Sequence, residues 1–140
     1  MAHPALPLRC LIMPTTVAQY CINVSDLERS IRFYEDVIGV SVQMRVEGDG
    51  VTEVVLGGQR GGGQLQLAHH HDHDGPIEHG NALWKIYFSV DDVHDVHRRV
   101  VEAGGIAEDS PQRLERWPAT IAFVRDPDGY LIELLQVHDD

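Results

Sequence analysis

Residues 17–39 read VAQYCINVSDLERSIRFYEDVIG, a strand pattern followed at once by a helix pattern. The first eight residues are rich in β-branched and aromatic side chains, which favour an extended strand. Apolar residues then recur at helical spacing, at Leu27, Ile31, Tyr34 and Ile38. Ser25 or Asp26 can cap the helix, and Gly39 can end it. This stretch therefore predicts a β-strand that leads directly into an amphipathic helix.

The same order of elements occurs twice along the chain. Three short extended runs separated by glycine-bearing turns follow the first helix, at residues 41–46, 51–58 and 63–68. The second half repeats the order, with a strand, a helix and three further runs at residues 83–90, 91–105, 112–117, 119–125 and 130–137. We therefore predict an α+β fold of two βαβββ modules.

The predicted domain boundaries follow from this repeat. The first module spans residues 16–68 and the second spans 83–138, with a linker at 69–82 between them. The segment over residues 1–15 is interrupted by three prolines and has no charged start of a signal peptide, so we expect a tail or an arm. A chain of 140 residues with 43% hydrophobic content fits one globular domain.

The charge balance restricts the class of partner. With 22 acidic and 11 basic residues the formal net charge is −11, which argues against nucleic acid and against an anionic membrane surface. No apolar run approaches the roughly 18 residues of a membrane span. Cys10 and Cys21 have no CxxC spacing, so a disulfide framework is not indicated and a reducing cytoplasm is the expected location. The expected partner is a small-molecule substrate.

Four histidines lie close together in the linker, within the stretch AHHHDHDGP at residues 68–76. In an extended backbone His69, His71 and His73 would share a face, which would permit a zinc or nickel site. The alternative is a flexible, acidic, solvated loop without rigid support for a metal. We predict the loop.

Two segments carry a family resemblance: SDLERSIRFYEDVIGV at residues 25–40 and IAFVRDPDGYLIELLQ at residues 121–136. Together with the duplicated order of elements, they resemble the vicinal oxygen chelate superfamily of glyoxalase I, bleomycin-resistance proteins and extradiol-type dioxygenases. The resemblance covers about residues 17–137. It implies two modules that curl a mixed sheet around a shared central cavity, usually in a homodimer. Metal-binding members place one ligand on the first and last strand of each module.

By motif, the resemblance places these ligand positions at Gln19, Gln66, Lys85 and Glu133. The internal repeat supports the same set, because Gln19 and Lys85 each lie five residues before an equivalent valine, and Gln66 in LQL matches Glu133 in IEL. Polar groups buried at such positions cost free energy unless they are paired or bind something.

The residue types depart from the glyoxalase pattern, which has a carboxylate at the position of Gln66 and a histidine at the position of Lys85. A protonated lysine has no lone pair for a metal. One hypothesis is that Lys85 replaces the charge of the metal beside Glu133, with the amides of Gln19 and Gln66 completing a polar cluster. The other is that Gln19, Gln66 and Glu133 bind one divalent metal ion while Lys85 turns away.

The chemistry that suits such a pocket is proton transfer next to a carbonyl group, with Glu133 as the catalytic general base and Lys85 or a glutamine amide stabilising the developing enolate oxygen. This predicts an enzyme of lyase or isomerase type. Strand parity adds Tyr87 beside Lys85, and Thr120 and Ala122 beside Glu133. Arg116 and Trp117 are further candidates for binding an anionic or aromatic group of the substrate. The remaining alternative is a binding protein of the bleomycin-resistance kind, which would hold a drug without chemistry.

Overall fold

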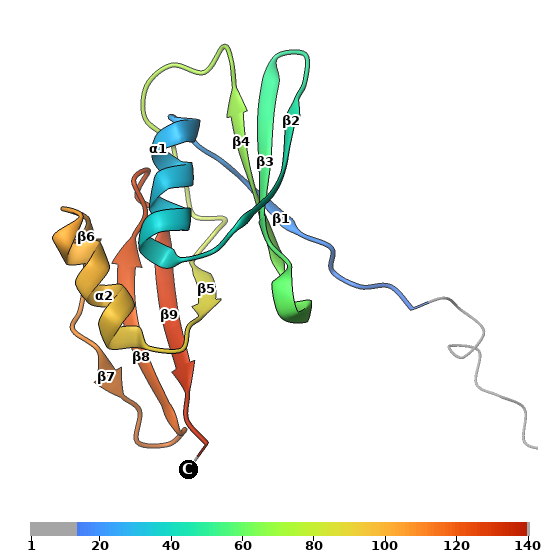
Figure 1. The fold of residues 1–140 in the computed structure, drawn as a ribbon. Helices are drawn as coiled ribbons and strands as arrows, with labels where there is room; N and C mark the ends of the chain where they lie inside the picture. Colours follow the sequence, from blue (N-terminus) through green and yellow to red (C-terminus); the bar gives the residue numbers. More distant parts are fainter. Residues whose placement is uncertain (1–13, 140) are drawn as a thin grey trace, which may run out of the picture.

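Each half of the chain forms one mixed β-sheet with a helix packed on it (Figure 1). The computed structural model describes residues 14–139, apart from the side chain of Arg60. Except for its last two residues, the predicted tail or arm over residues 1–15 lies outside the described part of the chain. No helix within residues 14–139 is long and apolar enough to cross a membrane.

The first sheet has the strand order β1-β4-β3-β2. Its strands are β1 (Tyr20–Asn23), β2 (Val42–Glu47), β3 (Val51–Gly57) and β4 (Gln64–His70), and a short 3₁₀ turn, η3 (Gln59–Gly61), joins the last two. β1 pairs with β4 in parallel, whereas the other neighbours are antiparallel. The helix between β1 and β2 is α1 (Leu27–Arg32), which continues as a π-helical segment, η2 (Phe33–Ile38).

The second sheet has the order β5-β9-β8-β6. Its elements are β5 (Ile86–Ser89), α2 (Val93–Glu102), β6 (Ile106–Ala107), β7 (Gln112–Arg113), β8 (Ala119–Arg125) and β9 (Leu131–Val137). The two short strands β6 and β7 both pair with β8, so they share the place that β2 takes in the first module. The predicted α+β architecture of two repeated modules is confirmed, and the two sheets do not close into a barrel.

Both helices begin at an aspartate whose side chain accepts a backbone N–H of the first turn. Asp26 accepts from the Arg29 N–H at 3.1 Å, and Asp92 accepts from the Asp95 N–H at 3.2 Å. Gly39 ends the first helical segment with a φ of +97°, in the left-handed region that favours glycine. In both helices the first residue after the capping aspartate, Leu27 or Val93, is buried.

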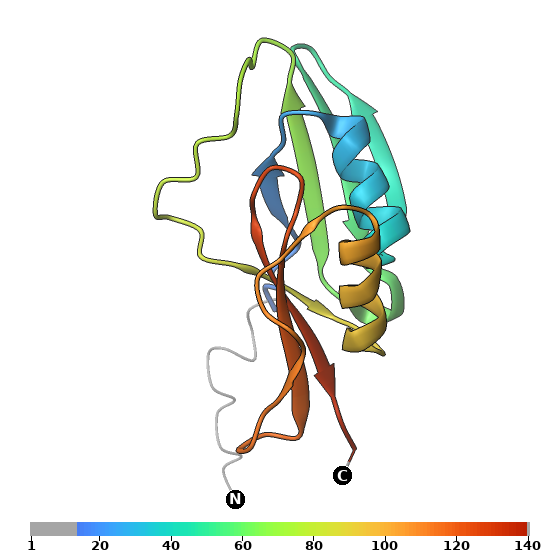
Figure 2. The ribbon, with the colours of Figure 1, turned by 90° about the vertical axis from the view of Figure 1, so that its left-hand side faces the viewer.

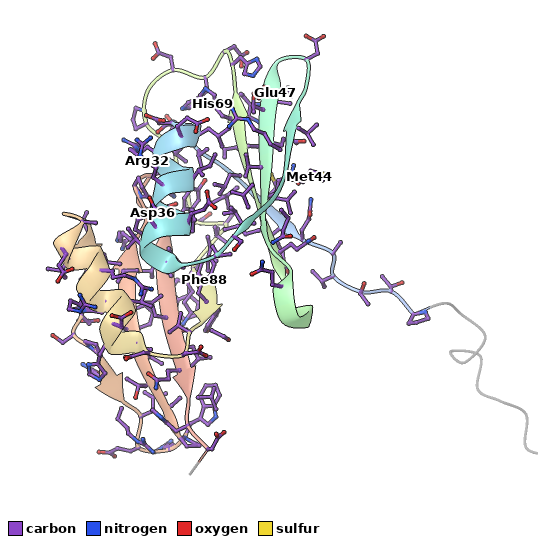
Figure 3. All side chains as sticks on the ribbon, viewed as in Figure 1. Arg32, Asp36, Met44, Glu47, His69 and Phe88 are labelled. Carbon is purple, nitrogen blue, oxygen red and sulfur yellow. The ribbon has the colours of Figure 1, made fainter. Side chains whose placement is uncertain are left out.

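The two modules meet at a buried tyrosine. Tyr34 on η2 is completely buried, and its hydroxyl donates to Asp126 Oδ2 of the second module at 2.8 Å. Its ring lies 5.8 Å from that of Phe88, which points from β5 toward η2 (Figure 3). Burial is the main cause that raises the pKa of Tyr34 well above its ordinary value, and it also raises the pKa of Asp126. This contact connects the two halves through a polar group that has no access to water.

The linker between the modules passes on the side away from the two helices (Figure 2). β4 runs through His70, two residues beyond the predicted strand end, so the first two linker histidines belong to the sheet. His69 lies at the end of β4 near the start of α1 (Figure 3), and its Nδ1 is 3.2 Å from the Val24 carbonyl oxygen.

Candidate functional site

Alternate residues of each sheet point away from the helices, and two equivalent polar residues lie at the centre of these open faces. In the first sheet Gln66 on β4 lies between Cys21 on β1 and Val55 on β3. In the second sheet Glu133 on β9 is flanked in the same way, by Tyr87 on β5 and Phe123 on β8. The repeat therefore gives two half-sites with matching geometry and different chemistry.

The half-site of the second module is an ion pair between Lys85 and Glu133. Lys85 Nζ lies 3.1 Å from Glu133 Oε2, and the two side chains are only 10% and 9% exposed. Within the described residues this oxygen is buried and makes no directed hydrogen bond. The adjacent ammonium compensates the burial of this oxygen, whose remaining lone pair can accept a proton or a hydrogen bond from a bound molecule.

Three aromatic rings surround the ammonium group of Lys85, which is the only lysine of the chain. Nζ lies 4.0 Å from the ring centroid of Trp84, 4.8 Å from that of Tyr87 and 5.3 Å from that of Phe123. Such cation–π contacts favour the charged amine. The Tyr87 side chain and then Glu133 raise the pKa of Lys85 above its ordinary value, against the opposing effect of desolvation. Lys85 is therefore a protonated, fixed cation.

The half-site of the first module is a pair of amides. Gln19 Nε2 donates to Gln66 Oε1, and Gln19 is exposed while Gln66 is half-buried. Each amide retains unused hydrogen-bonding capacity, because a carboxamide carries two donors and an acceptor with two lone pairs. The pair can bind a polar group of a substrate but brings no charge.

The two half-sites lie in separate sheets. Among residues 14–139, no hydrogen bond or ion pair connects the Gln19–Gln66 pair with the Lys85–Glu133 pair. The structure thus brings the four predicted residues together as two pairs.

The predicted placement of Thr120 and Ala122 beside Glu133 was wrong. Phe123 lies opposite Glu133, whereas Thr120 lies opposite Gln136 and is on the other face of the sheet, where its Oγ1 is 2.7 Å from His138 Nε2. The cause is the turn after β8. The Tyr130 N–H donates to Asp126 Oδ1 at 2.9 Å and the Asp126 N–H to the Tyr130 carbonyl at 3.0 Å, so the turn includes Tyr130 and the register moves by one residue.

Arg116 and Trp117 lie apart from the ion pair. They line a cavity of about 510 Å³ formed by residues 113–118, and neither Lys85 nor Glu133 contributes to it. Trp117 is 49% exposed, so it is not a core residue. The structure does not bring these two side chains to the site for which the sequence suggested them.

The linker histidines contact backbone and neutral side chains. His70 Nε2 lies 3.0 Å from Asn23 Oδ1, His71 Nε2 lies 2.8 Å from Thr52 Oγ1, and His73 Nε2 lies 2.8 Å from the Gly75 carbonyl. A cavity of about 600 Å³ adjoins them, between β1 and the linker. In the described part of the chain, no three histidine, cysteine, aspartate or glutamate side chains are placed to hold a metal ion.

The four positions of the paired half-sites do not fit a divalent metal centre of the glyoxalase kind. Only Glu133 offers an anionic oxygen, and Lys85 offers a cation in direct contact with it. The Gln66 amide oxygen is an uncharged metal ligand at best, and it already accepts a hydrogen bond from Gln19. A protein site for zinc or nickel needs several lone-pair donors and tolerates no ammonium among them.

Comparisons with known proteins agree with this architecture. The sequence profile of the Glyoxalase/Bleomycin resistance protein/Dioxygenase superfamily matches residues 16–134. A protein of Vibrio cholerae named probable lactoylglutathione lyase is 34% identical over 119 residues, which are 82% of this chain and 86% of the relative. The lactoylglutathione lyase of Haemophilus influenzae is also 34% identical over 119 residues, with 82% and 87% covered.

Solved structures show the same fold. The trypanothione-dependent glyoxalase I of Leishmania major superimposes with a TM-score of 0.75 at 28% identity and covers 88% of this chain and 87% of that chain. Glyoxalase I of Zea mays gives a TM-score of 0.77 at 25% identity over 86% of this chain, which spans only 44% of the maize chain. An antibiotic-binding protein of Streptomyces sp. CB03234, at 24% identity and a TM-score of 0.71, covers 91% of this chain and 99% of its own and shows likeness of fold alone.

Proposed function

Because the chain belongs to the Glyoxalase/Bleomycin resistance protein/Dioxygenase superfamily, we propose that it is a glyoxalase-type lyase that moves a proton next to the carbonyl group of a small molecule. One observation carries this proposal: Glu133 is a buried carboxylate with an oxygen that makes no directed hydrogen bond within the described residues, on the open face of its sheet. Relatives at 34% identity are named lactoylglutathione lyase, so lactoylglutathione and related thioesters are the first substrates to test.

In the proposed reaction Glu133 acts as the general base. Its carboxylate accepts the proton of the carbon next to the carbonyl, and the electron pair of the C–H bond moves to the carbonyl oxygen to form an enolate. When the deprotonated carbon carries a hydroxyl group, this enolate is an enediolate. Return of the proton to the former carbonyl carbon, with transfer of the hydroxyl proton to the other oxygen, completes an isomerisation in which no atom is lost. A positioned base contributes about 10²–10⁴-fold to such a proton transfer.

The test is exchange of that proton with solvent. Lactoylglutathione and a panel of other carbonyl compounds are incubated with the protein in D₂O, and NMR follows loss of the signal of the proton next to the carbonyl. We expect protein-dependent exchange for at least one thioester. Binding to the protein without any exchange across the panel would favour a binding protein and contradict the enzyme proposal.

We further propose that two copies of the chain assemble and that each site combines Gln19 and Gln66 of one copy with Lys85 and Glu133 of the other. The separation of the half-sites on two sheets supports this, as do the large apolar residues exposed near them: Val17, Tyr20, Leu83, Trp84 and Tyr87. Exposed apolar patches of this kind are typical of interfaces. The cytoplasm stays the proposed location, on the basis of the cysteine usage alone.

Mixing two inactive variants tests the shared site. A Gln66→Ala chain and a Glu133→Gln chain are each expected to lose exchange activity. In a mixed dimer with shared sites, one site carries both changes and the other carries neither, so activity is expected to return. Light scattering reports the dimer, and an unchanged loss after subunit mixing would place each site within one chain.

A further inference from the structure

We propose that Lys85, in place of a divalent metal ion, supplies the positive charge of this site, and that a substrate therefore binds through a single carbonyl oxygen. The source of the charge follows from the geometry of the second half-site. The mode of substrate binding rests on the proposed function. It departs from the metal-dependent chemistry that the family resemblance implies.

Space and charge around Glu133 disfavour a metal ion there. A zinc ion bound to a carboxylate lies about 2.0–2.2 Å from the oxygen. Lys85 Nζ already lies 3.1 Å from Glu133 Oε2. A metal ion on the same oxygen would lie within about 5 Å of a unit positive charge, where repulsion in a partly buried site costs several kcal/mol. The ammonium would also compete with the metal for Glu133, the only anionic ligand among the four positions.

Three aromatic rings and the ion pair hold the Lys85 side chain in place. Trp84, Tyr87 and Phe123 approach the ammonium at 4.0, 4.8 and 5.3 Å. Trp84 and Tyr87 flank Lys85 in the sequence, whereas Phe123 comes from β8. Moving the side chain away would break these three contacts together with the ion pair. The rings therefore fix the cation beside the base, where an enolate oxygen forms.

The Lys85 ammonium can bind fewer substrate oxygens than a metal ion can. A metal ion with open coordination positions binds two neighbouring oxygens of a substrate at once. An ammonium has only three N–H donors, and Glu133 and the three rings already surround this one. We therefore expect one substrate oxygen at the ammonium, with the Gln19 and Gln66 amides available for other polar groups.

Metal binding is the direct test, and its readout does not depend on activity. The linker could capture metal by itself, so the experiment uses a background variant in which His70, His71 and His73 are replaced by glutamine. Calorimetric titration with Ni²⁺ and with Zn²⁺, followed by elemental analysis after dialysis, is expected to give far less than one ion per chain. One ion per chain that disappears on Glu133→Gln would overturn the proposal.

A matched variant is expected to gain the metal binding that the natural sequence lacks. Gln66→Glu with Lys85→His, in the same background, restores the residue types of the glyoxalase pattern and is expected to gain about one bound ion per chain. Should that double variant not fold, Lys85→Met gives a second readout, because it removes the charge and keeps most of the volume. Its exchange rate is expected to fall about 10²–10³-fold, as for loss of one donor to a developing oxyanion, and added metal is not expected to restore it. Recovery with metal would contradict the inference.

A pair of ligands tests the single-oxygen contact. A hydroxamate offers two neighbouring oxygens to a metal, whereas its O-methyl ether chelates poorly. For an ammonium site we expect the two compounds to bind with affinities that agree within a few fold, and a preference of tenfold or more for the hydroxamate would overturn the proposal. If no carbonyl compound exchanges its proton, the proposed function fails while the metal titration still decides the nature of the charge.

Discussion

Replacing Glu133 by glutamine is expected to lower the rate of proton exchange by about 10²–10⁴-fold, the typical contribution of a positioned base. Glutamine has nearly the same volume, and the equivalent position of the first module already carries Gln66 on the same kind of strand. The shape of the sheet therefore tolerates the amide. What the amide lacks is an oxygen basic enough to take a proton from carbon. The measurement is the initial rate of solvent deuterium exchange at saturating substrate.

The matched control is Glu102→Gln, the same chemical change at an exposed carboxylate of α2 that pairs with Arg98. It is expected to leave the rate unchanged. Loss of the Glu133 charge also leaves the Lys85 ammonium without its partner, so circular dichroism must show that the variant is folded. Glu133→Asp keeps a carboxylate on a shorter side chain and is expected to retain an intermediate rate. A folded Glu133→Gln protein with the full rate would show that this carboxylate is not the base.

The architecture was predictable because two independent periodicities agreed along the chain. Strand parity and helical spacing alternate in the same order in both halves, and each helix starts at an aspartate that follows a strand directly. The repeat also singled out Lys85 and Glu133, because a charged residue within an apolar stretch stands out in the sequence. The contact between their charged atoms at 3.1 Å agrees with that expectation.

The surroundings of the ion pair were not predictable to the same degree. The predicted strands at residues 119–125 and 130–137 leave four residues for the turn after β8, but hydrogen bonds to Asp126 draw Tyr130 into the turn. The slip of one residue placed Thr120 and Ala122 where Phe123 lies. An aspartate at the start of such a turn is a recognisable signal, since its side chain can accept backbone N–H groups within the turn.

Trp84 was missed for a different reason. The sequence predicts a strand over residues 83–90, whose parity would turn Trp84 away from Lys85, whereas β5 begins only at Ile86 and leaves Trp84 outside the strand. Only its position in the sequence next to Lys85 pointed to a contact. The separation of the two half-sites on different sheets was also not predictable, because periodicity describes each sheet and not the approach of one sheet to another.

Replacing Tyr34 by phenylalanine is expected to reduce the free energy of unfolding by about 1–3 kcal/mol at neutral pH, because it leaves a buried carboxylate oxygen without its donor. The hydroxyl donates to Asp126 Oδ2 at 2.8 Å, and both side chains are buried between the modules. The ring itself remains, so the contacts with Phe33 and Phe88 persist. Urea unfolding followed by fluorescence measures the difference.

The loss is expected to depend on pH with a definite sign. Burial raises the pKa of Asp126 in the folded state, so this carboxyl contributes stability that is present below its unfolded pKa of about 3.9 and is lost as the pH rises through the folded pKa. The Tyr34 hydroxyl stabilises the ionised form, which the variant can no longer do. The difference between wild type and Tyr34→Phe should therefore be small near pH 4 and grow toward pH 7. An equal difference at both pH values would mean that the hydroxyl acts on the packing between the modules and not on the charge of Asp126.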